Sequence, residues 1–160
     1  VWPFVHQMNP SASVLALAST DVDLSGIEEG QAITVVWRGK PVFIRHRTPS
    51  EIAQAENVEV SQLPDPQSDL ERVKRQEWLI LVGVCTHLGC APTKKFEHGK
   101  TSGLGEDWVG GFFCPCHGSA FDLAGRVYRN VPAPTNLEVP PYSFLSDNRI
   151  LVGVGPEDTA

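Results

Sequence analysis

The sequence predicts an all-β protein built from short antiparallel strands. Three observations favour this class: the chain has 13 Pro and 14 Gly among 160 residues, few stretches have helical periodicity, and short apolar or β-branched runs alternate with turn residues. A chain of this length can bury one sizeable core. We therefore expect one main domain of short strands joined by loops.

The first strands are predicted from β-branched runs and one turn signal. A strand is expected near residues 21–24. Residues 32–37 and 42–45 are both apolar and extended in character, and the sequence Arg-Gly-Lys-Pro at 38–41 between them is typical of a turn. These residues therefore predict an antiparallel hairpin.

One short helix is predicted after the hairpin. The Thr48 hydroxyl can cap its first turn, Pro49 suits the first helical position, and Glu51 lies three residues after the cap. The helix is expected to end near residue 56. Residues 61–76 are polar and contain two prolines, so we expect a surface excursion there.

The second half of the chain contains a buried strand and two further extended segments. Residues 78–84 form a continuous apolar run, which predicts a strand buried on both faces. Residues 91–110 read as a long polar loop with four glycines, and residues 111–113 lead out of it. A turn at Ala124-Gly125 is expected within residues 121–128, and a last strand at residues 149–154.

The charge of the chain excludes one class of function. The formal net charge is −6, whereas proteins that bind nucleic acid in general carry a basic stripe. We therefore expect no nucleic-acid partner.

The N-terminal residues allow two interpretations. Residues 1–8 are mostly apolar, but they are far fewer than the roughly 20 apolar residues that span a bilayer. They are either the end of a truncated membrane anchor, with Trp2 at the interface, or an N-terminal strand. Residues 9–20 are small and polar at their start, which is typical of a linker.

All four cysteines lie in two short segments that also contain histidine. The first segment is Cys-Thr-His-Leu-Gly-Cys at residues 85–90, and the second is Cys-Pro-Cys-His-Gly-Ser at residues 114–119. Two Cys and two His can hold zinc, or a [2Fe–2S] cluster with thiolates on one iron and imidazoles on the other. Zinc modules commonly pair Cys with Cys and His with His locally. The mixture of one thiolate and one imidazole in each loop favours the two-iron cluster.

One cysteine in each segment is left over. If Cys85 and Cys114 are ligands, then Cys90 and Cys116 can form a disulfide between the loops, which would indicate an oxidising compartment. Residue types alone also allow the reverse, with Cys90 and Cys116 as ligands and the other two paired.

These motifs resemble those of the Rieske iron–sulfur proteins of cytochrome bc complexes. The match extends to Val-Pro-Ala-Pro at residues 131–134, which is similar to the loop that covers the cluster in that family. The resemblance implies an antiparallel β sandwich of three sheets with one short helix. It also implies an anchor remnant at residues 1–8, a flexible hinge at 9–20 and a Rieske domain at 21–160, with a cluster-binding subdomain at about 84–135.

The resemblance also implies a role for each matched residue. Cys85 and Cys114 would bind the inner iron, and His87 and His117 the outer iron. Ser119 would donate its hydroxyl to a bridging sulfide, and Leu88 would form part of the tip that enters the quinol pocket. The alternative for Leu88 is packing beneath residues 131–134. By the same resemblance, Cys90 and Cys116 would form the disulfide.

Two features depart from the family pattern. Phe121 stands where most respiratory members have a tyrosine, whose hydroxyl donates to a cysteine sulfur and favours the reduced cluster. We therefore expect a lower reduction potential than in relatives that carry the tyrosine. The segment between His87 and Cys114 is also longer than in typical members.

The function implied is electron transfer in a quinol–cytochrome c oxidoreductase. The subunit would take one electron and a proton from quinol, with His117 and His87 at the site of transfer, and pass the electron to a c-type cytochrome. Its partners would be cytochrome b, a c-type cytochrome and the membrane. We expect a bacterial inner-membrane protein with its head on the periplasmic side, or a mitochondrial one facing the intermembrane space.

Two other functions compete with this one. A Rieske ferredoxin serving an oxygenase shares the four ligands but lacks the two extra cysteines, so Cys90 and Cys116 count against it. A structural zinc module is disfavoured by the mixed ligands of each loop.

Overall fold

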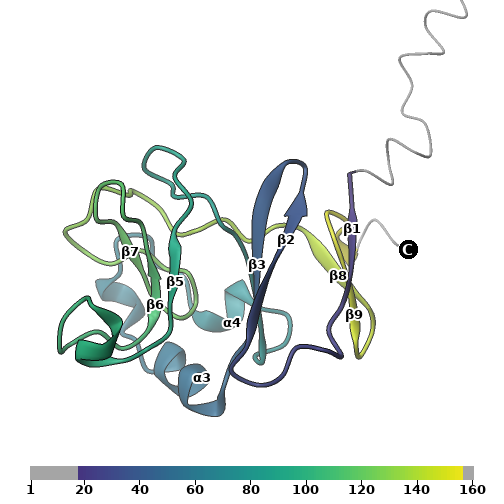
Figure 1. Ribbon diagram of the computed structural model, residues 1–160, viewed down its shortest axis with the longest axis horizontal. Coiled ribbons are helices and arrows are strands. Elements are labelled where there is room, and N and C mark those ends of the chain that lie inside the picture. The colour runs from purple at the N-terminus through teal and green to yellow at the C-terminus, as the bar shows by residue number, and fades with distance from the viewer. Residues whose placement is uncertain (1–17, 157–160) are drawn as a thin grey trace, which may run out of the picture.

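The computed structural model describes residues 18–156 (Figure 1). The predicted anchor remnant at residues 1–8 and all but the last three residues of the predicted hinge at 9–20 lie outside the described residues. Within the described part, no helix is long and apolar enough to cross a membrane.

Nine short strands form three antiparallel sheets within residues 18–156, which confirms the predicted fold class. The first sheet has the order β1 (Thr20–Asp23), β9 (Arg149–Val152) and β8 (Tyr142–Ser146). The middle sheet has the order β2 (Ala32–Trp37), β3 (Lys40–His46) and β4 (Trp78–Val82). The third sheet has the order β5 (Thr93–Lys95), β6 (Gly111–Phe113) and β7 (Ala120–Phe121).

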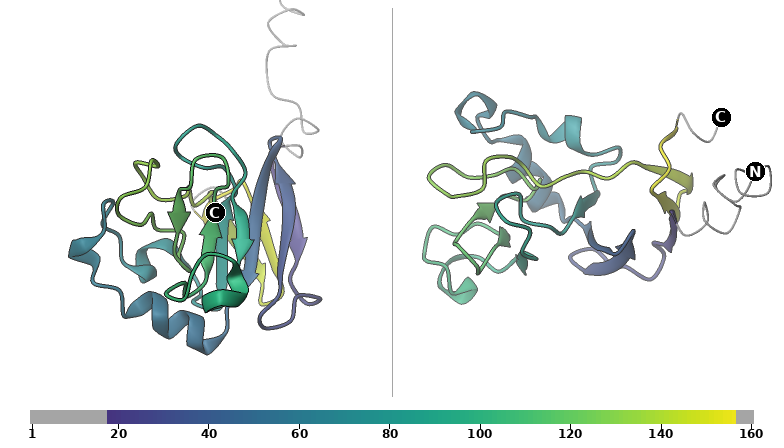
Figure 2. Two further views of the ribbon diagram at one scale, coloured as in Figure 1. Left: turned by 60° about the vertical axis from the view of Figure 1, so that its left-hand side comes forward. Right: turned by 90° about the horizontal axis from the view of Figure 1, so that it is seen from above.

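The middle sheet lies between the other two (Figures 1 and 2), and its strand β4 is buried on both faces. Side chains alternate between the faces of a strand. In β4, Trp78, Ile80 and Val82 enter the core shared with the first sheet, whereas Leu79 and Leu81 enter the core shared with the third sheet. This explains why the strand reads as a continuous apolar run and not as an alternating one.

The helices begin at capping boxes. In α3 (Pro49–Glu56), the Thr48 side chain accepts from the Glu51 N–H and the Glu51 side chain accepts from the Thr48 N–H, as predicted. A second helix, α4 (Asp69–Arg72), lies in the segment that was expected to be a surface excursion, and Ser68 caps it in the same way. Two single turns of 3-10 helix, η1 (Val60–Gln62) and η2 (Gly99–Ser102), complete the helical segments of the described residues.

The predicted polar loop at residues 91–110 is more ordered than expected. Its first part forms β5, which pairs with β6 in the register Thr93↔Phe113. The Trp108 indole N–H donates to the Lys95 carbonyl at 2.9 Å, so the end of the segment packs back on its beginning. The segment therefore completes the third sheet, from which the second Cys/His loop projects.

One buried ion pair connects α4 to the end of β3, and a second lies within the turn that follows the second Cys/His loop. The Arg47 guanidinium lies 2.7 Å from the Asp69 carboxylate, and that of Arg126 lies 2.8 Å from Asp122. The Asp122 carboxylate also accepts from the N–H groups of Ala124 and Arg126, which closes the turn predicted at residues 124–125. Breaking one partner of such a buried pair typically costs about 3–5 kcal/mol.

Candidate metal centre

The two Cys/His segments adopt the same backbone turn. In the first, Cys85 N–H donates to Cys90 C=O at 2.7 Å and Gly89 N–H donates to Cys85 C=O at 2.9 Å. In the second, the Cys114 N–H donates to the Ser119 C=O at 2.7 Å and the Gly118 N–H donates to the Cys114 C=O at 3.0 Å. The glycine in each turn has a positive φ, +87° at Gly89 and +83° at residue 118, which favours glycine over other residues. Each of these two equivalent loops thus contributes one cysteine and one histidine to the site.

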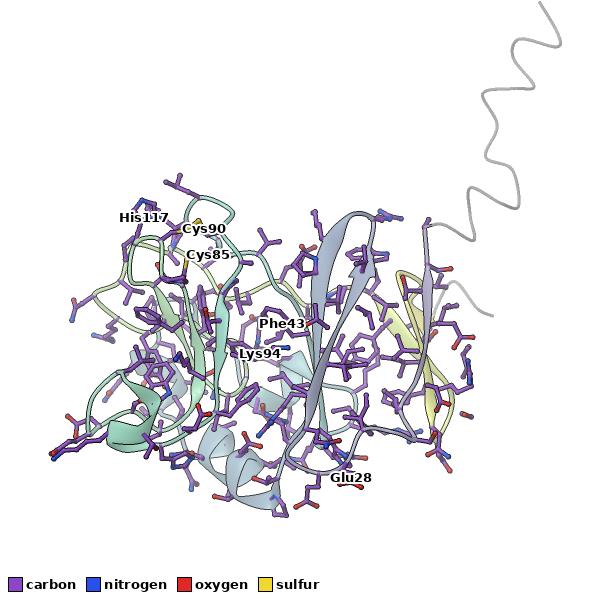
Figure 3. The ribbon with its side chains drawn as sticks, in the orientation of Figure 1. Glu28, Phe43, Cys85, Cys90, Lys94 and His117 are labelled. Carbon is purple, nitrogen blue, oxygen red and sulfur yellow. A yellow bond between two sulfur atoms is a disulfide. The ribbon has the colours of Figure 1, made fainter. Side chains whose placement is uncertain are left out.

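The four predicted ligands come together at one end of the molecule. Cys85 and Cys114 are buried free thiols, each 2% exposed. The rings of His87 and His117 lie edge to face, with their centroids 4.8 Å apart. His87 is half-buried and His117 is exposed, and Figure 3 shows His117 at the rim of the site with Cys85 below it. The arrangement places sulfur inside and imidazole outside.

One imidazole nitrogen indicates that a ligand belongs here. The Nδ1 atom of His87 is buried and has no hydrogen-bond partner among residues 18–156. A buried polar atom without a partner costs about 1–3 kcal/mol. Metal coordination through Nδ1 would satisfy this atom and leave Nε2 of the same ring for an outer contact.

The environment of the thiols also fits a metal group. Burial raises the pKa of the Cys85 thiol, and the neighbouring Cys114 raises it further, although the His87 backbone and the Ser119 side chain lower it by hydrogen bonding. The Cys85 thiol therefore resists ionisation on its own. A bound metal ion deprotonates a coordinating thiol outright, so the donor set fits an iron–sulfur cluster.

The other two cysteines are joined to each other. Cys90 and Cys116 form a disulfide between the two loops, with 26 residues of separation. Their sulfurs and that of Cys114 lie within 4.8 Å of one another, but disulfide sulfurs are not thiolates, so only Cys114 of these three can bind a metal. The pairing answers the question that residue types left open. A bridge over this length contributes about 3 kcal/mol in the chain-entropy account.

Residues 131–135, the third loop, are held by hydroxyl groups of both Cys/His loops. Ser119 is fully buried, and its Oγ accepts from the Ala133 N–H at 3.0 Å. Because that bond uses only a lone pair, the Ser119 O–H is still available to donate toward sulfur. The Thr86 hydroxyl donates to the Thr135 carbonyl at 2.6 Å. Sequence reasoning singled out Ser119 but missed Thr86, whose position beside a ligand histidine was the available signal.

Leu88 lies open to solvent beside the histidines. Its side chain is 70% exposed, the highest value among the large exposed hydrophobic residues described. The alternative of packing beneath the third loop is therefore wrong. An exposed leucine at a loop tip is available for contact with an apolar partner.

Phe121 is fully buried next to the thiols. It packs in one cluster with Cys85 and Cys114, on the strand that follows the second loop. Its ring has no donor to offer a cysteine sulfur.

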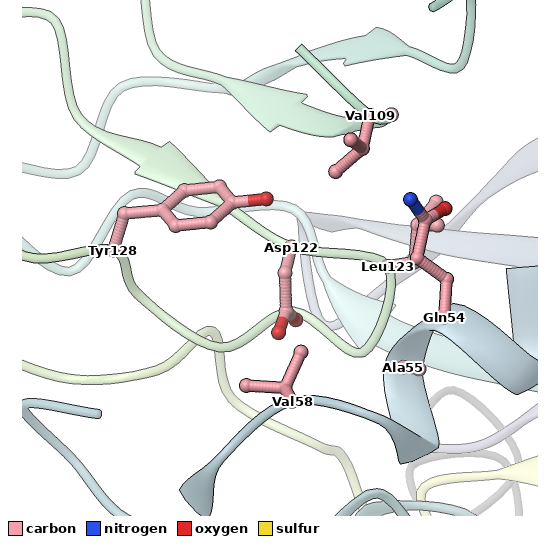
Figure 4. Close-up of a pocket in the computed structure, with 8 residues that line it drawn as sticks. Gln54, Ala55, Val58, Val109, Asp122, Leu123 and Tyr128 are labelled. Carbon is pink, nitrogen blue, oxygen red and sulfur yellow. The ribbon is translucent and has the colours of Figure 1, made fainter. Parts of the chain in front are cut away.

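A pocket elsewhere in the fold is too small for a substrate. Figure 4 shows it between α3 and the turn at residues 122–126, near Tyr128 and Val109. Its volume is about 30 Å³, which is room for roughly one water molecule. None of the predicted site residues lines it.

Comparison with known proteins gives one family. The model of the Rieske [2Fe–2S] domain matches residues 43–142. The chain is 57% identical over 153 residues to the ubiquinol–cytochrome c reductase iron–sulfur subunit of Rhodospirillum rubrum, covering 96% of this chain and 80% of that protein.

The chain is also similar to a mitochondrial Rieske subunit and to a chain of a solved structure. The chain is 55% identical over 150 residues to the cytochrome b-c1 complex subunit Rieske-1 of Nicotiana tabacum, covering 94% of this chain. It spans only 54% of that relative's length. A chain in the structure of a hyperthermophilic respiratory Complex III superimposes with a TM-score of 0.59 at 29% identity, covering 93% of this chain and 86% of that one.

Proposed function

The chain belongs to the Rieske [2Fe–2S] protein family, and from this premise we propose that it is the electron-transfer subunit of a quinol–cytochrome c oxidoreductase. It takes one electron and a proton from quinol and passes the electron to a c-type cytochrome. The observation that carries the proposal is the pair of equivalent loops that present buried thiols, two outward histidines and a disulfide at one exposed tip.

The ligands follow from burial. Cys85 and Cys114 would hold an inner iron, because their thiols are enclosed, and His87 and His117 would hold an outer iron at the rim. The [2Fe–2S] cluster supplies one-electron redox chemistry when bound. Ser119 donates its hydroxyl toward the sulfur atoms, and the disulfide between Cys90 and Cys116 keeps the two loops together.

The histidines accept the proton that quinol releases. An imidazole that binds iron through one nitrogen keeps the other for hydrogen bonding. His117 is exposed, so its second nitrogen can accept a hydrogen bond from a quinol hydroxyl and then the proton. His87 is more enclosed, so we assign it the lesser part in this transfer.

The exposed tip of the site, which includes Leu88, is the surface that contacts the partner proteins. Leu88 contacts the quinol pocket of cytochrome b, and the head then moves on the hinge at residues 9–20 to reach the c-type cytochrome. An N-terminal anchor ending in residues 1–8 attaches the head, at residues 21–160, to the membrane. Prolines placed at residues 15–19 test the hinge: unchanged turnover in the assembled complex would show that movement on it is not needed.

The disulfide supports a location outside the cytosol, since disulfides persist in oxidising compartments. We propose the periplasmic side of a bacterial inner membrane. The alternative is the intermembrane-space side of the mitochondrial inner membrane.

The test is the reduction potential of the cluster-loaded protein as a function of pH. Rieske centres span about −150 to +300 mV. We expect a positive value that falls as pH rises through the ionisation of the histidine ligands. A value near the negative end that is flat around neutral pH would indicate an oxygenase-type carrier, and zinc without iron would contradict the cluster itself.

A further inference from the structure

The segment from residue 61 to 76 is tied to the end of the third loop through Asn136. This asparagine is 6% exposed, and its side-chain amide donates to the Asp65 carbonyl and to Gln67 Oε1, both at 2.9 Å. Its Oδ1 accepts from the Val127 N–H at 3.0 Å, and its own N–H donates to the Asp65 carboxylate at 3.0 Å. Since a buried amide is costly to leave unpaired, this set of bonds fixes the position of residue 136.

Gln67 is the common acceptor of this network. Its Oε1 accepts from Arg72 Nη1 at 2.6 Å as well as from the Asn136 amide. Its carbonyl accepts from Arg126 Nη1 at 3.2 Å. Three donors therefore reach one residue from three places: from α4, from the turn after the second Cys/His loop, and from the segment after the third loop.

Arg72 extends the network to the same turn. Its Nε donates to the Ala124 carbonyl at 2.7 Å, and its Nη2 donates to the Leu137 carbonyl at 2.5 Å. Arg72 and Asn136 thus bind the segments before and after the third loop. Gln67 accepts a hydrogen bond from both of these side chains.

The third loop is consequently held at two points of its own and at the residue that follows it. Ser119 holds Ala133 and Thr86 holds Thr135, and these two hydroxyls belong to the Cys/His loops themselves. The third point, at Asn136, is held from outside by Gln67 and Asp65. A shift at residue 136 moves the neighbouring Thr135 relative to Thr86, which lies next to His87.

We propose that Gln67 is a positioning residue: its amide oxygen fixes the end of the third loop and, through it, the cover over the histidine rim. The inference rests on the proposed function only in placing the cluster beneath this loop. It assigns a role in the centre to a segment that contributes no ligand.

The variants separate the acceptor from the bulk of the side chain. Gln67→Met keeps length and volume but removes the acceptor, whereas Gln67→Glu keeps an oxygen that can accept from both Arg72 and Asn136. Gln62→Met makes the same change at an exposed glutamine in η1 and serves as the matched control.

The first measurement is amide hydrogen exchange at Ala133 and Asn136, with Ile150 in the first sheet as the internal reference. Gln67→Met should speed exchange at residues 133 and 136 by roughly tenfold, because the partly buried hydrogen bonds from the Arg72 guanidinium and the Asn136 amide are lost. Gln67→Glu and Gln62→Met should stay within about twofold of the parent protein. Equal acceleration at Ile150 would show a general loss of stability and overturn the proposal, as would unchanged exchange at residue 133.

The second measurement is the electron paramagnetic resonance spectrum of the reduced, cluster-loaded protein. Gln67→Met should change its g-values, and Gln67→Glu should restore them. A Gln67→Met spectrum identical to that of the parent would overturn the proposal. A parent protein that bound no cluster would contradict the proposed function, while the exchange measurement would still decide the role of Gln67.

Discussion

The rings of Phe43 and Phe112 stack in parallel, with centroids 5.6 Å apart and an interplanar angle of 1°. Phe43 comes from β3 of the middle sheet and Phe112 from β6 of the third sheet, so this contact joins the two layers directly. Lys94 adds to the same junction, because its ammonium lies 5.3 Å from the Phe43 ring and donates to the Thr34 hydroxyl at 2.9 Å. Figure 3 labels Phe43 and Lys94 between the two sheets.

We expect Phe43→Leu to destabilise the protein by about 2 kcal/mol, because the substitution removes the ring stack and leaves a partial cavity. The measurement is the free energy of unfolding in denaturant. Val36→Ala, at a position 68% exposed on β2, is the control and should change it by less than about 0.5 kcal/mol. Equal effects of the two substitutions would mean that the stack is not what joins the layers.

Gly111→Ala should lower the free energy of unfolding more than Phe43→Leu does. A Cβ atom at residue 111 would lie 2.1 Å from the Phe121 carbonyl oxygen, and the residue has a φ of +149°. Because the obstacle is backbone, the strands on either side of the second Cys/His loop would have to separate, at a cost of about 3 kcal/mol.

The control for this prediction is Gly26→Ala, since a Cβ there would meet nothing within 4 Å. The measurements are the free energy of unfolding and the iron content after reconstitution. If Gly111→Ala were as stable as Gly26→Ala, the close approach of β6 to β7 would be refuted.

The sequence could indicate which Cys and His residues lie together, because each predicted ligand pair is local. Cys85 and His87 are two residues apart, and Cys114 and His117 are three apart, so one turn of backbone determines their proximity. The bond between Gln67 and Asn136 joins residues 69 positions apart. Only tertiary packing selects that partner from the many polar residues available, so no sequence pattern could indicate it.

Two of the elements that the sequence did not predict, α4 and β5, were missed because their local signals are weak. Helix α4 has a capping box from Ser68 to Glu71, but it is four residues long and follows two prolines, so composition favoured a loop. Strand β5, Thr-Lys-Lys, lacks the apolar side chains that identify a strand, and its pairing with β6 determines its structure. By contrast, the apolar run of β4 and the capping box of α3 were strong enough to predict both elements correctly.

Stability should fall at high pH because of Tyr128. Burial, with a smaller contribution from Asp122, raises the pKa of Tyr128 from 10.0 to about 12. The folded state therefore keeps the phenol neutral where the unfolded chain ionises it, so this stabilisation is complete below pH 10 and is lost as pH rises toward 12. The loss should be on the order of 2 kcal/mol.

The measurement is the free energy of unfolding between pH 9 and about 12. Tyr128→Phe should flatten the decline. The chain has one other tyrosine, Tyr142, whose pKa burial also raises, so titration of tyrosinate absorbance in Tyr142→Phe isolates Tyr128. A midpoint at the ordinary value of a free tyrosine in that variant would contradict the prediction.

Leu88→Ala should impair quinol oxidation without altering the centre. The side chain is 70% exposed, so its removal costs the folded protein little, but an apolar contact with the partner is lost. We expect kcat/KM for quinol in the assembled complex to fall by about tenfold, since three carbon atoms leave the contact. The reduction potential should stay unchanged.

Leu145→Ala is the matched control, as Leu145 is 50% exposed on β8, in the first sheet. It should leave kcat/KM unchanged. If both variants behaved alike, Leu88 would have no special part in docking.

Phe121→Tyr should raise the reduction potential. Phe121 is fully buried in the cluster of side chains that contains Cys85 and Cys114, so a hydroxyl added to its ring can donate to a cysteine sulfur. Such a donor stabilises the reduced, more negative centre. A bond of about 1.4 kcal/mol corresponds to roughly 60 mV for one electron. Phe144→Tyr, in the first sheet, adds the same hydroxyl away from the thiols and should leave the potential unchanged. Direct voltammetry of the loaded variants decides the matter, because an unchanged or lowered potential in Phe121→Tyr would show that the hydroxyl does not reach the sulfur.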